Sequence, residues 1–294
     1  MDHINFMIPL IAGLFGLCVG SFLNVCIYRI PRDGVSIGWP LFSFCPHCFS
    51  TLHWYENLPV FSYFIQKGKC RSCYIWISPR YPFVEILTAA IFAFLAHRFL
   101  HWPQISWSLF FIHSLLLCSL LVASFIDLDL RIIPDEIDKP GMVLAPILSY
   151  LVPSLHLKKD LVSLPSSFPS FFHTLPAKAA LSSLLGILVG SGVILAVGIL
   201  GKILFQKEAM GFGDVKFMGM IGGFLGWKAT LIAFLLACFL GAFVGILKKM
   251  VSRDSYIPFG PFLALGAVGM LYWRQPILHL IFYEYPRWLK QLWI

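Results

Sequence analysis

The chain has 294 residues and a net charge of +8, yet only 12% of its residues are charged and 59% are hydrophobic. A soluble domain carries about twice that charged fraction, so the composition excludes an ordinary soluble globular protein. The strand alternation of a membrane barrel is absent, and the apolar runs therefore predict an all-α polytopic membrane protein. Basic loops facing anionic lipid account for the positive charge, so no nucleic-acid partner is expected.

Eight apolar segments, taken in chain order, predict about eight transmembrane helices. They are Phe6–Ile27, Phe83–Ala96, Ile105–Ile126, Gly141–Val152, Ala179–Phe205, Phe217–Gly226, Thr230–Leu247 and Ile257–Trp273. Several approach the roughly 20 residues that a helix needs to cross a bilayer, and the shorter ones require tilt or local thinning. The first segment has neither a basic region before it nor a small-residue cleavage site after it, so we expect a retained helix rather than a signal peptide.

Basic residues predict the orientation of these helices. They are more frequent in the loop Tyr28–Pro82 and in every second loop after it than in the loops between. By the positive-inside rule the first set is cytoplasmic and the N-terminus is periplasmic. The chain then divides into a first helix (1–27), a cytoplasmic loop (28–82), a membrane-embedded core (83–273) and an interfacial tail (274–294) with Trp288 and Trp293 at headgroup depth.

The cytoplasmic loop contains two C-x2-C pairs, "CPHC" at Cys45–Cys48 and "CRSC" at Cys70–Cys73, separated by 21 residues. Four thiolates in two tight turns suit the tetrahedral coordination of zinc. The alternative is two disulfides, which the reducing cytoplasmic side disfavours. We therefore predict a structural zinc site on Cys45, Cys48, Cys70 and Cys73, in an insert between the first two membrane helices.

Two aspartates at the edges of apolar helices are the strongest catalytic candidates. Asp127 directly continues the apolar run that ends at Ile126, and Asp214 opens the sixth span in "GFGD", between glycines that let other backbone approach closely. Two carboxylates that share a site cannot both ionise easily. One can activate a water while the other donates a proton, which suggests an aspartyl protease pair.

Structural roles for the same aspartates remain as alternatives at this point. Asp127 could be a helix cap, and Asp214 could form a salt bridge with Lys216 or Arg131. Asp129 lies about 200° further around the helix than Asp127, so we expect it to support the site rather than react.

Three more acids follow closely. Asp135 comes after Pro134 and is expected to cap the next helix. Glu136 and Asp138 are expected to be solvated loop acids.

Several separated motifs resemble the type IV prepilin peptidases, the GxGD aspartyl proteases of the bacterial inner membrane that are also called prepilin leader peptidase/N-methyltransferases. The resemblance runs from about Gly20 to Gly266 and includes "GSFLNVCIYRIPR", the two cysteine pairs, "WYENLPVFSYFIQKGKC", "SPRYPFVEILTA", "FIDLDLRIIPD", "GFGD" and "IPFGPFLALGA". In this family the first catalytic Asp precedes the Pro of a (Leu/Ile)-Pro-Asp by seven residues. Counting back from Pro134 therefore selects Asp127, and "GFGD" selects Asp214.

The resemblance implies cleavage of the basic leader of type IV prepilins and type II secretion pseudopilins, after a glycine and at the cytoplasmic face. It also implies methylation of the new N-terminal residue with S-adenosylmethionine. Residues that match the family's polar signature near the cysteine loop are candidates for that second activity: Glu56, Asn57, Arg80 and Glu85. Gly211 and Gly213 are expected to let the substrate backbone approach, with Lys216, Asp129 and Pro134 in supporting positions.

Two other classes of function use the same residues differently. A transporter or proton relay would carry ions through Asp127 and Asp214 without proteolysis. A zinc-bearing membrane scaffold would tolerate neutral substitutions at both aspartates.

Overall fold

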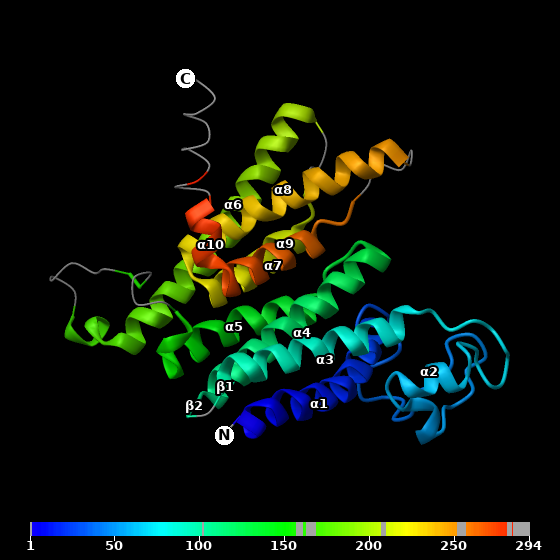
Figure 1. Cartoon of the computed structure of the whole chain (residues 1–294). Helices are drawn as coiled ribbons and strands as arrows, with labels where there is room; N and C mark the ends of the chain where they lie inside the picture. The colour runs from blue at the N-terminus through cyan, green and yellow to red at the C-terminus, as the bar shows by residue number, and fades with distance from the viewer. Residues whose placement is uncertain are drawn as a thin grey trace. The chain divides into compact units, whose positions relative to one another are not determined.

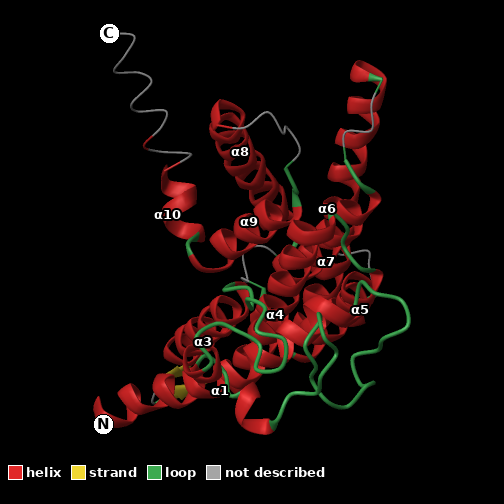
Figure 2. Cartoon of the chain, turned by 90° about the vertical axis from the view of Figure 1, so that its right-hand side faces the viewer, coloured by secondary structure: helices red, strands yellow, loops and turns green. Residues whose placement is uncertain are grey.

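The computed structural model describes residues 2–101, 103–156, 161–162, 169–206, 210–251, 257–280 and 284. Within these ranges the long elements are all α-helices, and the one paired sheet is a short antiparallel hairpin of β1 (Leu100–His101) and β2 (Gln104–Ile105) (Figure 1, Figure 2). The chain forms two compact units, residues 1–126 and 127–294. Most of the predicted interfacial tail, including Trp288 and Trp293, lies outside the described residues.

Unit 1 contains α1 (Asp2–Arg29), α3 (Arg80–Phe99) and all of α4 (Trp107–Leu130) except its last turn. Helices α1 and α3 pack closely because α1 presents glycines to its neighbour. A Cβ added to Gly20 would lie 2.6 Å from the Cα of Glu85, so the two backbones are in contact there. Further along, the rings of Phe15 and Phe92 pack with their centroids 5.9 Å apart.

The insert between α1 and α3 has little regular structure beyond the short helix α2 (Phe61–Ile65) and is drawn mainly as loop in Figure 2. Arg29, at the end of α1, organises its first part. The Arg29 guanidinium is buried and donates hydrogen bonds to four backbone carbonyls, those of Ser36, Ile37, Pro40 and Phe42. Because a buried guanidinium must be satisfied, these bonds fix the path of the loop against the end of the helix.

Unit 2 is built from α5 (Asp135–Leu151), α6 (Leu175–Phe205), α7 (Phe212–Leu225), α8 (Trp227–Val251), α9 (Gly260–Tyr272) and α10 (Arg274–His279). Helix α7 is its centre, and every residue from Phe217 to Leu225 is buried. Helices α6 and α7 touch through Gly186 and Gly222, where a Cβ on either residue would collide with the carbonyl oxygen of the other. Small residues thus let these two helices approach at backbone distance.

Among the described helices, α1, α3, α4, α6 and α8 are long and apolar enough to cross a membrane. This confirms the polytopic helical class. The other three predicted spans form α5, α7 and α9, which have only 17, 14 and 13 residues. Helix α7 ends at Gly226, whose positive φ of 76° terminates the helix at the end of the predicted apolar segment. Helices α5 and α7 begin before their predicted apolar segments, at Asp135 and Phe212, whereas α9 begins after its predicted start, at Gly260.

Candidate active site

The first aspartate of the predicted pair is buried where two helices meet. Asp127 lies in the last turn of α4 and is 5% exposed. Its Oδ2 accepts a hydrogen bond of 2.8 Å from the backbone N–H of Gly260, the first residue of α9. The N-terminus of a helix offers unpaired N–H groups and a favourable dipole, so this contact suits a carboxylate. Asp127 is therefore not a cap of its own helix, which was the structural alternative.

The second aspartate begins a different helix of the same unit. Asp214 is in the first turn of α7, and its Oδ2 accepts a hydrogen bond of 3.2 Å from the N–H of Gly211 just before the helix. Asp214 precedes the predicted span and lies outside the five long helices. Burial and then the negative charge of Asp127 raise the pKa of Asp214 to about 6, against the opposing hydrogen bond from Gly211. The two carboxylates are therefore close enough for the charge of Asp127 to act on Asp214.

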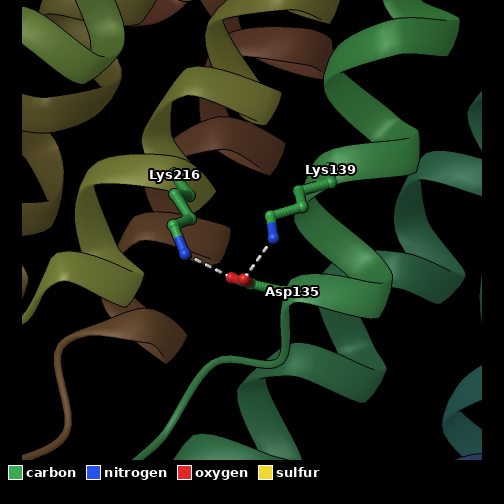
Figure 3. Close-up of polar contacts among 3 residues, drawn as sticks. All are labelled: Asp135, Lys139 and Lys216. Carbon is green, nitrogen blue, oxygen red and sulfur yellow. Dashed lines mark hydrogen bonds and ion pairs between the residues drawn. The ribbon is translucent and has the colours of Figure 1, made fainter.

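Lys216 was one of the two cations, with Arg131, that could form a salt bridge with Asp214. Lys216 instead forms an ion pair of 2.5 Å with Asp135, which also pairs with Lys139 at 2.6 Å (Figure 3). Hydrogen bonds and charge from Lys139 and Lys216 lower the pKa of Asp135. The expectation that Asp135 caps α5 is wrong, since Pro134 occupies the N-cap position and the Asp135 side chain reaches across to α7. Asp135 and Lys216 thereby tie the first turns of α5 and α7 together.

The neighbouring acids separate into exposed and buried groups. Asp129 and Glu136 are exposed, as expected for residues that do not belong to the reacting pair. Asp138 was expected to be a solvated loop acid, and this is wrong: its side chain is 0% exposed. The sequence pattern misses this because burial of Asp138 comes from the packing of α5 in unit 2, not from its own segment.

Gly213 faces Ile133, the residue before Pro134, with an added Cβ 3.3 Å from the Ile133 Cβ. The glycine thus lets the first turn of α7 pack against the segment that leads into α5. Gly211 is exposed and lies at the N-cap of α7.

Four cysteine thiols gather in the insert of unit 1. The sulfur atoms of Cys45, Cys48, Cys70 and Cys73 all lie within 4.8 Å of one another, and two of the cross-pair separations are 3.9 Å. Tetrahedral thiolate ligands at about 2.3 Å from a zinc ion would be separated by about 3.8 Å, so the donor set fits this metal. None of the four cysteines forms a disulfide. The cluster can hold a metal ion.

The two C-x2-C turns have the same backbone design. Each is closed by a β-bridge, Phe44 with Thr51 and Lys69 with Trp76. In each turn the residue after the second cysteine, Phe49 or Tyr74, has a positive φ of 58° and donates its N–H to the carbonyl of the first cysteine at 2.9 Å. Two such turns facing each other bring the four thiols together.

A cavity of about 420 Å³ lies beside this cluster, between α1, the insert and the start of α3. Its size is within the range of small-molecule sites. All four residues expected to serve methyl transfer line it, namely Glu56, Asn57, Arg80 and Glu85. Glu85 accepts a hydrogen bond of 2.7 Å from the N–H of Val60, which ties the insert to α3. Within the described part of the chain, the buried Oδ1 of Asn24, another lining residue, has no hydrogen-bond partner.

Sequence reasoning missed three residues of these two sites. Gly260 holds Asp127, and its signal was the Gly-Pro pair in a segment that otherwise carried no assigned role. Asn24 is buried and lines the cavity, and its signal was a polar residue in an apolar run. Asp138 was seen but taken as solvent-exposed.

Comparison with known proteins shows which family the chain resembles over its length. Residues 14–99 match the model of the bacterial peptidase A24 N-terminal domain, and residues 114–246 match that of the type IV leader peptidase family. A prepilin leader peptidase/N-methyltransferase of Aeromonas hydrophila is 32% identical, with 90% of each chain covered. A leader peptide-processing enzyme for type 4 prepilin-like proteins from Escherichia coli O78:H11 is 30% identical, with 90% of this chain and 93% of the relative covered.

A prepilin leader peptidase/N-methyltransferase of Myxococcus xanthus is 39% identical over 240 residues, but the match spans only 62% of that relative's length. No solved structure matches the chain. Because the family models and the relatives cover most of its length, the chain belongs to the type IV leader peptidase family.

Proposed function

We propose that this protein is an aspartic endopeptidase that removes the basic leader of type IV prepilins and type II secretion pseudopilins at the cytoplasmic face of the bacterial inner membrane. The observation that carries the proposal is the pair Asp127 and Asp214, a buried and a half-buried carboxylate on different helices of one unit, with the negative charge of Asp127 acting on Asp214. Curated relatives of the chain are named for leader peptide processing. The basic loops support a periplasmic N-terminus and a cytoplasmic insert.

In the proposed reaction one carboxylate of the pair is ionised and the other is protonated. The ionised group removes a proton from a water molecule, whose oxygen attacks the scissile carbonyl carbon. The protonated group donates to the carbonyl oxygen. The C–N bond then breaks as the leaving amine takes the proton that the first carboxylate removed from water, and a hydroxyl of the intermediate returns its proton to the second carboxylate as the new carboxyl group forms. The backbone N–H groups of Gly260 and Gly211 hold Asp127 and Asp214 in place through these steps.

The cavity of unit 1 supports a second activity, methylation of the newly exposed amine. When bound, S-adenosylmethionine would supply an electrophilic methyl group. Glu56 and Glu85 offer carboxylates to hold the substrate ammonium, and the unpaired Oδ1 of Asn24 offers a further acceptor for a polar ligand. Arg80 and Asn57 would contact polar groups of the cofactor. The cavity volume and this polar lining fit a molecule of that size and character.

The cysteine cluster would hold zinc as a structural ion. It forms one wall of the same cavity, which Cys45 and Cys70 line together with Glu56 and Glu85. Zinc would therefore fix the loop that shapes the methyl-transfer site.

Coexpression with a prepilin, followed by mass spectrometry of the pilin N-terminus, tests both activities at once. The expected product starts directly after the leader glycine and carries one added methyl group. An unprocessed prepilin would refute the peptidase, and a processed but unmethylated one would refute the methyltransferase. Ion flux without cleavage would favour a proton relay instead.

A further inference from the structure

Asp138, a third acid beside the proposed catalytic pair, is fully buried. It lies in the first turn of α5, its side chain is 0% exposed, and in the described part of the chain neither of its carboxylate oxygens has a hydrogen-bond partner. An ionised carboxylate in such a place would lose its hydration without gaining an ion pair. The position therefore favours the neutral acid.

Asp138 is on the side of α5 that packs against α7. Three and seven residues further along α5, Gly141 and Ala145 lie against Met220 and Gly223 of α7. Residues with this spacing share one face of a helix. Asp138 therefore lies on the same face of α5 as Gly141 and Ala145, at the end nearer the first turn of α7, where Asp214 and Lys216 lie.

The charged groups acting on Asp138 come from these two helices. Burial, then the negative charge of Asp135, raises its pKa to about 8, with Lys216 opposing and Asp214 adding to the rise. Helix α6 also packs here, but its stretch from 191 to 197 contains no titratable side chain. Of the described residues whose charge acts on Asp138, Lys216 is the positively charged one, and it already forms an ion pair with Asp135.

Resting on the proposed peptidase function, we propose that Asp138 is a positioning residue whose neutral carboxyl keeps the first turns of α5 and α7 packed and leaves Lys216 bound to Asp135. When Asp138 ionises, it competes with Asp135 for Lys216 and places a further negative charge beside Asp214. Both effects disturb the geometry and the charge of the catalytic pair, so ionisation of Asp138 lowers the proteolytic activity in alkaline solution beyond the fall that ionisation of the pair itself causes.

The test is the pH dependence of cleavage by the full-length protein in detergent micelles. The substrate is a synthetic peptide with a basic leader, a glycine before the cleavage point and a phenylalanine followed by an apolar helix after it. For wild type, a group that ionises near pH 8 predicts a fall of about tenfold between about pH 7 and pH 9, in addition to the fall caused by ionisation of the pair above about pH 6. Asp138→Asn cannot ionise and should show the fall of the pair alone, so its activity relative to wild type should rise by about tenfold over that range.

Two controls make the result specific. Glu136→Gln removes an exposed acid from the same turn and should keep the tenfold alkaline fall. Asp138→Leu fills the site without a polar group and should show the same pH profile as Asp138→Asn, without the additional alkaline fall. The fall of activity above about pH 6, where the pair loses its proton, should be the same in wild type and in all variants.

An unchanged alkaline fall in Asp138→Asn would overturn the inference, as would loss of cleavage at every pH in a folded variant. Failure of both neutral variants to fold would overturn it too, because a neutral side chain is predicted to be tolerated. These outcomes differ from failure of the proposed function, in which wild type cleaves the peptide at no pH.

Discussion

Substitution of Gly260 by alanine probes the geometry of the proposed pair while both aspartates stay in the sequence. Gly260 donates its N–H to the Oδ2 of Asp127 at 2.8 Å. A Cβ at this position would lie 2.7 Å from the same oxygen and 3.3 Å from the Cβ and Cγ of Asp127. Carbon and oxygen atoms do not approach so closely, so the carboxylate must rotate away and lose its hydrogen bond.

The size of the effect follows from that lost bond. Hydrogen bonds to charged groups contribute about 1.5–3 kcal/mol. At about 1.4 kcal/mol per tenfold change in rate, Gly260→Ala should lower kcat/KM for peptide cleavage by about 10- to 150-fold. Gly260 begins α9 and does not have a positive φ, so the alanine adds no backbone strain.

The assay is peptide cleavage in detergent, with the melting temperature recorded for each variant. Gly192→Ala is the matched control, because a Cβ there would meet nothing within 4 Å. We expect Gly192→Ala to retain wild-type activity. A Gly260→Ala variant that folds and cleaves within about threefold of wild type would refute the assigned position of the Asp127 carboxylate.

Four further changes test other parts of the account. Gly222→Val should lower the melting temperature by forcing α6 from α7, a loss of about 1–3 kcal/mol or more; an unchanged melting temperature would contradict the close contact. Glu85→Gln should lower N-methylation by about tenfold while cleavage stays within about twofold, measured by mass spectrometry; equal loss of both would argue against a separate methyl-transfer site. Cys45→Ser should reduce bound zinc from about one ion per chain to a small fraction in elemental analysis. Asp129→Asn should change the cleavage rate by less than about threefold, and complete loss would mean that the wrong aspartate was chosen.

Features set by local spacing could be predicted from the sequence. The two C-x2-C turns repeat one short backbone design, so their spacing alone predicts four convergent thiols. The separation of Asp127 from Asp129 follows from helical geometry, and burial of the first with exposure of the second confirms it. The helical membrane class follows in the same way from composition.

Features set by packing between distant segments could not be predicted. Asp135 follows a proline and has the local pattern of a cap, but Lys216, 81 residues away, draws its side chain to α7. Asp138 lies in a polar stretch, yet it is buried because α5 packs against α7 through Gly141 and Ala145. Gly260 lies 133 residues from the aspartate that it holds, and no local pattern connects the two.

The central claim is that Asp127 and Asp214 together perform the cleavage. Its most direct test is the fraction of prepilin processed in cells that express wild type, Asp127→Asn or Asp214→Asn at equal levels in the membrane, measured by mass spectrometry of the pilin N-terminus. We expect full processing by wild type and none by either variant, since each amide removes one of two carboxylates that act as a unit. Processing by either variant at the wild-type level would contradict it.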